Sequence, residues 1–225
     1  YSGKLDADIS LKGRMSSIEK EKYEDFNANG TLKLVDMLYN SPDLPDAVNV
    51  KSMLFRFSPK NLALENLDAK MGKSDFQVNG TIDNYLGYFL RDEMLKGSFN
   101  FNSNQIDLDQ LMGSSNTPAA SSDTKAPIEE SGDALLIPDN VDFNLNAKIN
   151  TLKYNGIGLK NVQGNIKVKE EIASLNNLTM NAMGGFVGLT GSYNTQNHSK
   201  PKVDIQYVLK ELDIAQLVSN FVTIE

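Results

Sequence analysis

Apolar and polar residues alternate along much of this chain. The clearest stretch, Val141 to Asn150, reads VDFNLNAKIN and has an apolar residue at every second position, with Asp, Asn or Lys between them. A strand with this period has one apolar face and one polar face. The alternation recurs at residues 5–15, 26–34, 76–82, 95–101, 162–168, 187–193 and 203–209. The pattern predicts a mainly β protein with about eight or more amphipathic strands.

Short helices are expected at three places. Asp107 with Gln110, and Asp213 with Gln216, have the spacing of a helix N-cap, so at each a strand should lead into a short helix. Residues 84–94 carry apolar side chains at helical spacing and predict the third helix.

A low-complexity segment separates two parts of the chain. Residues 113–127 are rich in Ser, Thr, Ala, Asp and Pro and contain no bulky apolar residue, so they cannot contribute to a core. We therefore expect a first unit at 1–112, a linker or long loop at 113–138, and a second unit at 139–225.

The two units resemble each other. LENLDAKMGKSDFQVNGTIDN from Leu64 aligns with LNNLTMNAMGGFVGLTGSYNT from Leu175, an offset of 175 − 64 = 111. Further on, the segment from Gly97 aligns with the segment from Val203, an offset of 203 − 97 = 106. The sequence therefore predicts a sheet made of two similar repeats.

Upstream of these segments the offset is larger. DISLKGRMSSI from Asp8 aligns with DFNLNAKINTL from Asp142, an offset of 142 − 8 = 134. The difference from the next offset, 134 − 111 = 23 residues, predicts an insertion in the first repeat around residues 35–57.

Glycines share the apolar positions of several predicted strands. A glycine within a strand marks a bend, a bulge or the close approach of another group. Here they either let the sheet curl over bulky neighbours such as Phe99 and Phe101 in a closed core, or curve it into a trough with room along its floor. These glycines are Gly13, Gly30, Gly80, Gly97, Gly164 and Gly191.

Composition excludes several classes of protein. The formal charge is 22 − 29 = −7 with no Lys/Arg cluster, so nucleic acid is not an expected partner. There is no cysteine, and hence neither a disulfide nor a thiolate metal site. The longest apolar run, residues 134–137, is far short of the roughly 20 residues that span a bilayer. The chain begins at Tyr1 without a signal peptide, which suggests a processed or excised piece of a longer protein.

Candidate catalytic and metal-binding residues are few. His198, the single histidine, lies in a polar turn and is best interpreted as a solvated loop residue. Asp6 and Asp8 fall on the polar side of their strand, and Asp107 is better explained as a helix cap than as a calcium ligand with Asp109. We expect a protein that is not an enzyme and holds neither a metal ion nor a cofactor.

Three segments resemble the AsmA-like family, particularly its Bacteroidetes members. They are FSPKNLALENLDAKMGKSDFQVNGTIDNYLGYFL from Phe57, LKGSFNFNSNQIDLDQLM from Leu95, and VDFNLNAKINTLKYNGIGLKNVQGNIKV from Val141, which LNNLTMNAMGG follows. This family is related to TamB and to the bridge-like lipid-transfer proteins. The resemblance implies a mainly β fold: a long, antiparallel, strongly curved sheet forming a half-open groove (a β-taco) from two repeats, with a few short helices.

The resemblance also implies a function. The chain would be part of a periplasmic protein, anchored to the inner membrane by a segment that this chain lacks. It would bind or conduct phospholipid, or another acyl-chain lipid, in support of outer-membrane assembly and lipid homeostasis. Protein partners at strand edges or end to end are expected as well. The alternative is a structural or adhesive β-repeat module with a closed core and no lipid.

The residues expected to line the lipid groove are those at the apolar positions of the strands. They are Leu11, Leu32, Val78, Ile82, Phe99, Phe101, Phe143, Leu145, Ile149, Val162, Ile166, Val168, Leu189, Tyr193, Ile205 and Tyr207.

Overall fold

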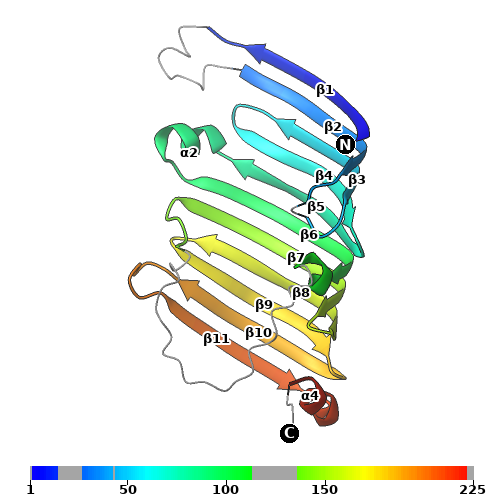
Figure 1. The fold of residues 1–225 in the computed structure, drawn as a ribbon. Helices are drawn as coiled ribbons and strands as arrows, with labels where there is room; N and C mark the ends of the chain where they lie inside the picture. Colours follow the sequence, from blue (N-terminus) through cyan, green and yellow to red (C-terminus); the bar gives the residue numbers. More distant parts are fainter. Residues whose placement is uncertain (1, 15–26, 43, 113–135, 222–225) are drawn as a thin grey trace.

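The computed structural model describes residues 2–14, 27–42, 44–112 and 136–221. Eleven strands form one open sheet in which the order of the strands follows the order of the sequence (Figure 1). The prediction of a mainly β protein is confirmed. The strands are β1 (Ser2–Lys12), β2 (Asn27–Tyr39), β3 (Val48–Phe57), β4 (Asn61–Met71), β5 (Ser74–Asp83), β6 (Leu95–Asp107), β7 (Val141–Tyr154), β8 (Ile157–Lys169), β9 (Ile172–Ala182), β10 (Gly185–Asn194) and β11 (Lys202–Lys210).

Three short helices lie at the ends of strands, where the sequence places them. They are α2 (Tyr85–Arg91), α3 (Leu108–Leu111) and α4 (Ile214–Phe221). Figure 1 shows α2 at the opposite ends of the strands from α3 and α4. The two predicted caps form, because the backbone N–H of Gln110 donates to Asp107 Oδ1 and that of Gln216 donates to Asp213 Oδ1, both at 3.1 Å.

The sheet is mixed, and the expectation of an antiparallel sheet is wrong at one junction. All neighbouring strands are antiparallel except β6 and β7, which run parallel. A parallel pair needs a long connection that returns the chain to the starting end. Residues 108–140, which include the predicted linker, provide that length. Most of the predicted linker, 113–138, lies outside the described residues.

Bulges keep apolar side chains on one face where the sequence period breaks. Leu64 and Leu67 in β4 are three residues apart, as are Leu175 and Leu178 in β9, yet their partners in β5 and β10 are only two apart. One extra residue in one strand of a pair is a β-bulge, which bends the strand. In β9 the bulge contains Asn177, whose φ of 49° is in the left-handed region.

Strand pairs recur at a constant offset. Hairpin β4–β5 and hairpin β9–β10 have the same strand lengths at an offset of 172 − 61 = 111. Phe57 pairs with Leu62 as Val168 pairs with Ala173, so β3 and β8 share this offset. The aligned region therefore includes β3. Because β3 has an equivalent strand in β8, the prediction of an insertion around residues 35–57 is wrong. The strand equivalent to β7 is β2 rather than β1, because their partners in β3 and β8 match.

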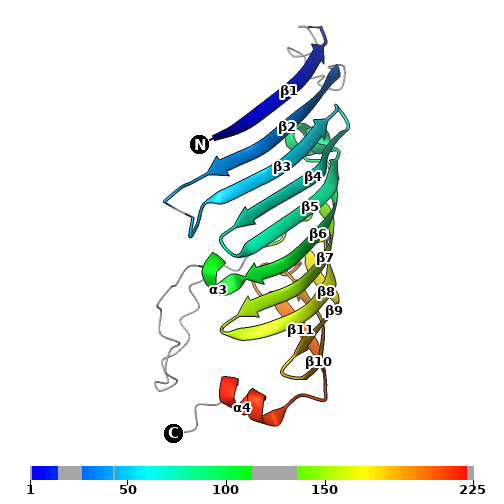
Figure 2. The same cartoon turned by 90° about the vertical axis from the view of Figure 1, so that its right-hand side faces the viewer.

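The sheet is a single layer in the described part of the chain. Figure 2, the view turned by 90°, shows no second sheet packed against the first. Apart from neighbouring strands, the substantial contacts join α2 to β6 and α3 to β7, both at strand ends. Few apolar residues are therefore buried among the described residues: Val50, Ala69, Ile106, Ile137, Val141, Val162 and Ala182.

Candidate functional site

The register assembles one continuous apolar face. Residues directly opposite each other on paired strands point to the same side of the sheet. Two rows of such residues cross every strand, and we call the side that they occupy the apolar face. The first row is Ile9, Gly30, Phe57, Leu62, Ile82, Gly97, Phe143, Val168, Ala173, Tyr193 and Val203. The second is Ala7, Leu32, Phe55, Leu64, Gly80, Phe99, Leu145, Ile166, Leu175, Gly191 and Ile205.

The remaining predicted lining residues join the same face beside these rows. A third row runs from Leu5 through Val78 and Phe101 to Ala147 and Gly164, and it continues in β9 to β11 at Leu178, Leu189 and Tyr207. Ile149 pairs with Val162. Leu11 pairs with Ala28 through the backbone, and its side chain is outside the described part of the chain.

No described element covers this face, although neighbouring side chains half-bury most of it. Ile166, in the middle of the sheet, is 39% exposed, and Tyr207 near the edge is 65% exposed. Val162 is an exception, because it is buried. A surface of contiguous apolar residues on this scale is typical of a binding surface.

Aromatic rings occupy the space above three of the glycines. A Cβ added at Gly30 would overlap the ring of Phe57, one at Gly80 the ring of Phe99, and one at Gly97 the ring of Phe143. These glycines therefore let large side chains of one strand lie close to the backbone of the neighbouring strand. The interpretation that every glycine leaves open room along a floor is wrong at these positions.

One hollow on the apolar face has an apolar lining. It has a volume of about 190 Å³ and is formed by β9, β10 and the edge strand β11. Gly191 contributes to it, so here a glycine does border free space. Its lining residues are Ala173, Leu175, Leu189, Gly191, Ser192, Tyr193, Val203 and Ile205.

The opposite face carries a row of asparagines that sequence reasoning missed. Their amides are hydrogen-bonded from strand to strand: Asn100 donates to Asn79 (3.0 Å), Asn146 to Asn100 (3.3 Å), Asn165 to Asn146 (2.9 Å) and Asn176 to Asn165 (3.2 Å). A larger hollow of about 530 Å³, to which mostly polar residues contribute, lies along this row. The signal in the sequence is Asn between apolar residues, but only the register brings the amides together.

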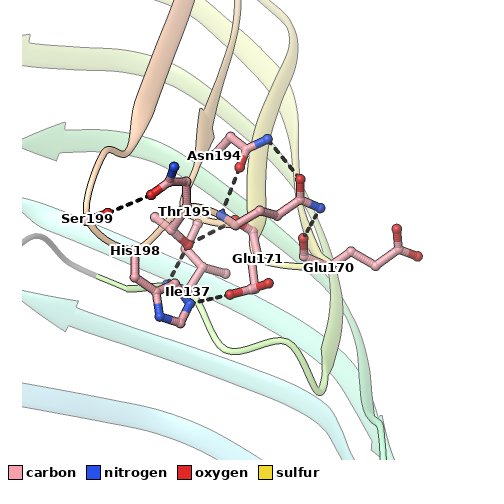
Figure 3. Close-up of polar contacts among 9 residues, drawn as sticks. Ile137, Glu170, Glu171, Asn194, Thr195, His198 and Ser199 are labelled. Atoms are coloured by element: carbon pink, nitrogen blue, oxygen red, sulfur yellow. Dashed lines mark hydrogen bonds and ion pairs between the residues drawn. The ribbon is translucent and has the colours of Figure 1, made fainter.

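Hydrogen bonds near His198 link the turn after β10 to Ile137 and to the turn between β8 and β9 (Figure 3). The Nε2 of His198 lies 2.5 Å from Glu171 Oε1 while the side chain stays 60% exposed, so the histidine is solvated yet has a partner that sequence reasoning missed. Thr195, fully buried, accepts a hydrogen bond from the backbone N–H of Ile137 (3.1 Å) and donates one to the carbonyl of Glu171 (3.0 Å). The Ser199 hydroxyl donates to Asn197 Oδ1 (2.8 Å).

The predicted pairs of carboxylates have structural partners. Asp109 accepts hydrogen bonds from the backbone N–H groups of Gly156 and Asn155, and these, with nearby Lys153, hold its pKa below the ordinary value. Asp6 lies opposite Lys33 on the polar side of β1. In the described ranges, no three His, Cys, Asp or Glu side chains are grouped as a metal site would require.

Asp75 is a further carboxylate with a shifted pKa. Burial raises this pKa, but hydrogen bonds from the backbone N–H groups of Asn104 (3.1 Å) and Gln105 (2.8 Å) and from the Ser103 hydroxyl (3.3 Å) lower it more. Its pKa therefore lies below the ordinary value. The hydrogen bonds of this carboxylate link the start of β5 to the end of β6.

Comparisons with protein-family models, with curated proteins and with solved structures found no match to this chain. Within the described residues, no helix has the length and apolar character to cross a membrane.

Proposed function

We propose that this chain binds the acyl chains of phospholipid along its apolar face. The observation that carries the proposal is the pair of rows that cross all strands of an open sheet. Ten strand spacings of about 4.8 Å make each row roughly 48 Å long, a continuous apolar path from one edge to the other. Such a path suits a long, flexible hydrocarbon better than a compact polar ligand.

Acyl chains need a dry surface but no directed bonds. Each buried CH₂ group contributes about 0.8 kcal/mol, so a hydrocarbon chain is held by area alone. Leu145 and Ile166 in the middle of the sheet supply such area and have no polar neighbour in their row. Among the described residues, the two rows hold apolar residues and glycine, which agrees with a lipid ligand.

The hollow formed by β9, β10 and β11 is the best-defined place for an acyl chain to rest. Leu189 and Ile205 both line it, and Ile205 is 46% exposed. Because the hollow opens beside the edge strand, a lipid could enter it from the side without parting any strands.

The finer architecture is part of this proposal. The constant offset of 111 in β3–β5 and β8–β10 supports two units of one design, β2 to β6 and β7 to β11. We propose that they form one groove with bends at the bulges. The resemblance to AsmA-like proteins adds a periplasmic location and a role in supplying lipid to the outer membrane. The alternative of a closed β-repeat core has less support, since the sheet is not closed.

Photo-crosslinking with a diazirine-bearing phosphatidylethanolamine tests the proposal. Leu189→Lys introduces a charge on the apolar face, and Thr190→Lys introduces the same charge on the opposite face of the same strand. We expect labelled peptides from β9 to β11, and about tenfold less labelling in Leu189→Lys than in Thr190→Lys, because a lysine in the hollow costs more than 1.4 kcal/mol of binding. Equal labelling of both variants, or labelling spread over both faces, would contradict the proposal.

A further inference from the structure

The last strand of the sheet has an open edge. Every residue of β11 is exposed, and among the described residues the strand pairs only with β10. Among its apolar residues, Val203 is 64% exposed and Leu209 is 57% exposed. An unprotected edge with alternating apolar residues is a template for another strand.

A strand of the same type, β6, lies inside the sheet and has a neighbour on both sides. Gly80 pairs with Phe99 in β6 as Gly191 pairs with Ile205 in β11, an offset of 205 − 99 = 106. Both strands lead into a helix capped by an aspartate at the same offset, 213 − 107 = 106. On its far side, β6 is paired in parallel with β7 from Leu95–Val141 to Asp107–Lys153.

We propose that the edge of β11 binds, in parallel orientation, a strand of the β7 type from a partner polypeptide. Such a strand has apolar residues at every second position and Asp, Asn or Lys between them. This inference depends on backbone pairing and not on the lipid proposal.

The register of the added strand follows from the two offsets. Each residue of β7 is numbered 141 − 95 = 46 higher than its partner in β6. Each residue of β11 is numbered 106 higher than the equivalent residue of β6. A residue of β11 therefore lies opposite the equivalent of the β7 residue whose number is 106 − 46 = 60 lower. Val203 then faces the equivalent of Phe143, and Ile205 faces the equivalent of Leu145. Val203 and Phe143 both belong to the first row, and Ile205 and Leu145 both belong to the second. The added strand therefore extends both rows of the apolar face.

Two pairs of polar positions are complementary in this register. Lys202 faces the equivalent of Asp142, and Gln206 faces the equivalent of Asn146. A second copy joined through its β1 edge fits less well. The antiparallel register that continues both rows places Val203 opposite Ile9, and it therefore puts Asp204 directly opposite Asp8. Like charges directly opposite each other destabilise a strand pair, which favours the β7-type strand.

Disulfide trapping tests the proposal, since the chain contains no cysteine of its own. The protein carries Lys202→Cys, an exposed site, and the probes are synthetic peptides of residues 141–154 with Asp142→Cys or Asn150→Cys. A disulfide forms readily only between residues whose Cβ atoms are close, as in directly opposite positions. The control peptide has the same composition in scrambled order with one cysteine, and circular dichroism checks that Lys202→Cys keeps the sheet.

The parallel register predicts that the Asp142→Cys peptide is trapped about tenfold faster than the Asn150→Cys peptide, which would lie at the far end of the strand. Faster trapping of the Asn150→Cys peptide would show antiparallel addition and overturn the proposal. Trapping no faster than with the scrambled peptide would also overturn it, as would disulfide-linked dimers of Lys202→Cys that form faster than the peptide adduct.

Discussion

Leu145 in β7 lies directly opposite Ile166 in β8, and both point to a face that no described element covers. They stand in the middle of the second row, where the core of a sandwich would normally be deepest. Instead, Ile166 is 39% exposed. The centre of this sheet is thus a surface rather than an interior. A charged side chain introduced there should therefore destabilise the protein less than it would in a closed core.

A charge at Ile166 tests that consequence. We expect Ile166→Lys to lower the free energy of unfolding by only about 1 kcal/mol, because the long lysine side chain can extend its ammonium into water. Urea denaturation followed by circular dichroism gives the value, with Thr190→Lys on the polar face as the control. A loss of more than about 4 kcal/mol would indicate an unpaired charge inside a closed core.

Substitution of Gly97 tests the close approach of aromatic rings. Gly97→Ala places a methyl group where the Phe143 ring lies, so we expect a loss of about 1–3 kcal/mol from overpacking. Gly158→Ala is the matched control, since a Cβ there meets nothing within 4 Å. Thermal melts should show Gly97→Ala alone shifted downwards, and Phe143→Leu in the same chain should recover part of the loss. Equal melts for both alanine variants would contradict the packing described.

The asparagine row should be most sensitive at Asn165, whose side chain makes several hydrogen bonds. The Asn165 side-chain amide donates to the Asn144 and Asn146 side chains (2.7 and 2.9 Å) and accepts from Asn176. We expect Asn165→Ala to cost about 1–3 kcal/mol, because its partners lose hydrogen bonds in a partly buried position. Asn150, whose side chain donates one bond to Asn104, should cost less when changed to Ala. The order of the two urea midpoints is the measurement, and a reversed order would contradict the assignment.

Acid should weaken the fold in part through Asp75. Its pKa in the folded protein lies below the ordinary value of 3.8, so its carboxylate adds stability above that pH. This contribution is lost as the pH falls through the folded-state pKa. Asp75→Asn should therefore be less stable than the parent at neutral pH, and the difference in melting temperature should shrink below about pH 4.

The exposed Asp204→Asn variant in β11 is the control for this titration. Asp204→Asn changes the net charge by the same amount as Asp75→Asn but removes no hydrogen bond to a backbone N–H. A difference between Asp75→Asn and the parent that stays constant from neutral to acid pH would contradict the role of the carboxylate.

Strands with unbroken alternation could be predicted from the sequence, and β7 and β8 are found where the pattern places them. β3, β4 and β9 do not appear in that pattern, because each changes its apolar positions at a bulge, as at Leu175 and Leu178. The parallel junction of β6 and β7 and the asparagine row both depend on register between distant segments. A period along one segment cannot provide that register. Alternation fixes which side chains share a face within one strand, so the members of the apolar face in each strand could be predicted. Their role as the lining of a lipid groove stays a prediction.

Native mass spectrometry of the purified chain tests the central claim most directly. If the apolar face binds lipid, the spectrum should contain protein ions with added masses of phospholipid, and Leu189→Lys should carry fewer of them than Thr190→Lys. A chain that purifies folded and free of lipid, and gains no lipid mass when phosphatidylethanolamine is supplied in detergent, would contradict the claim.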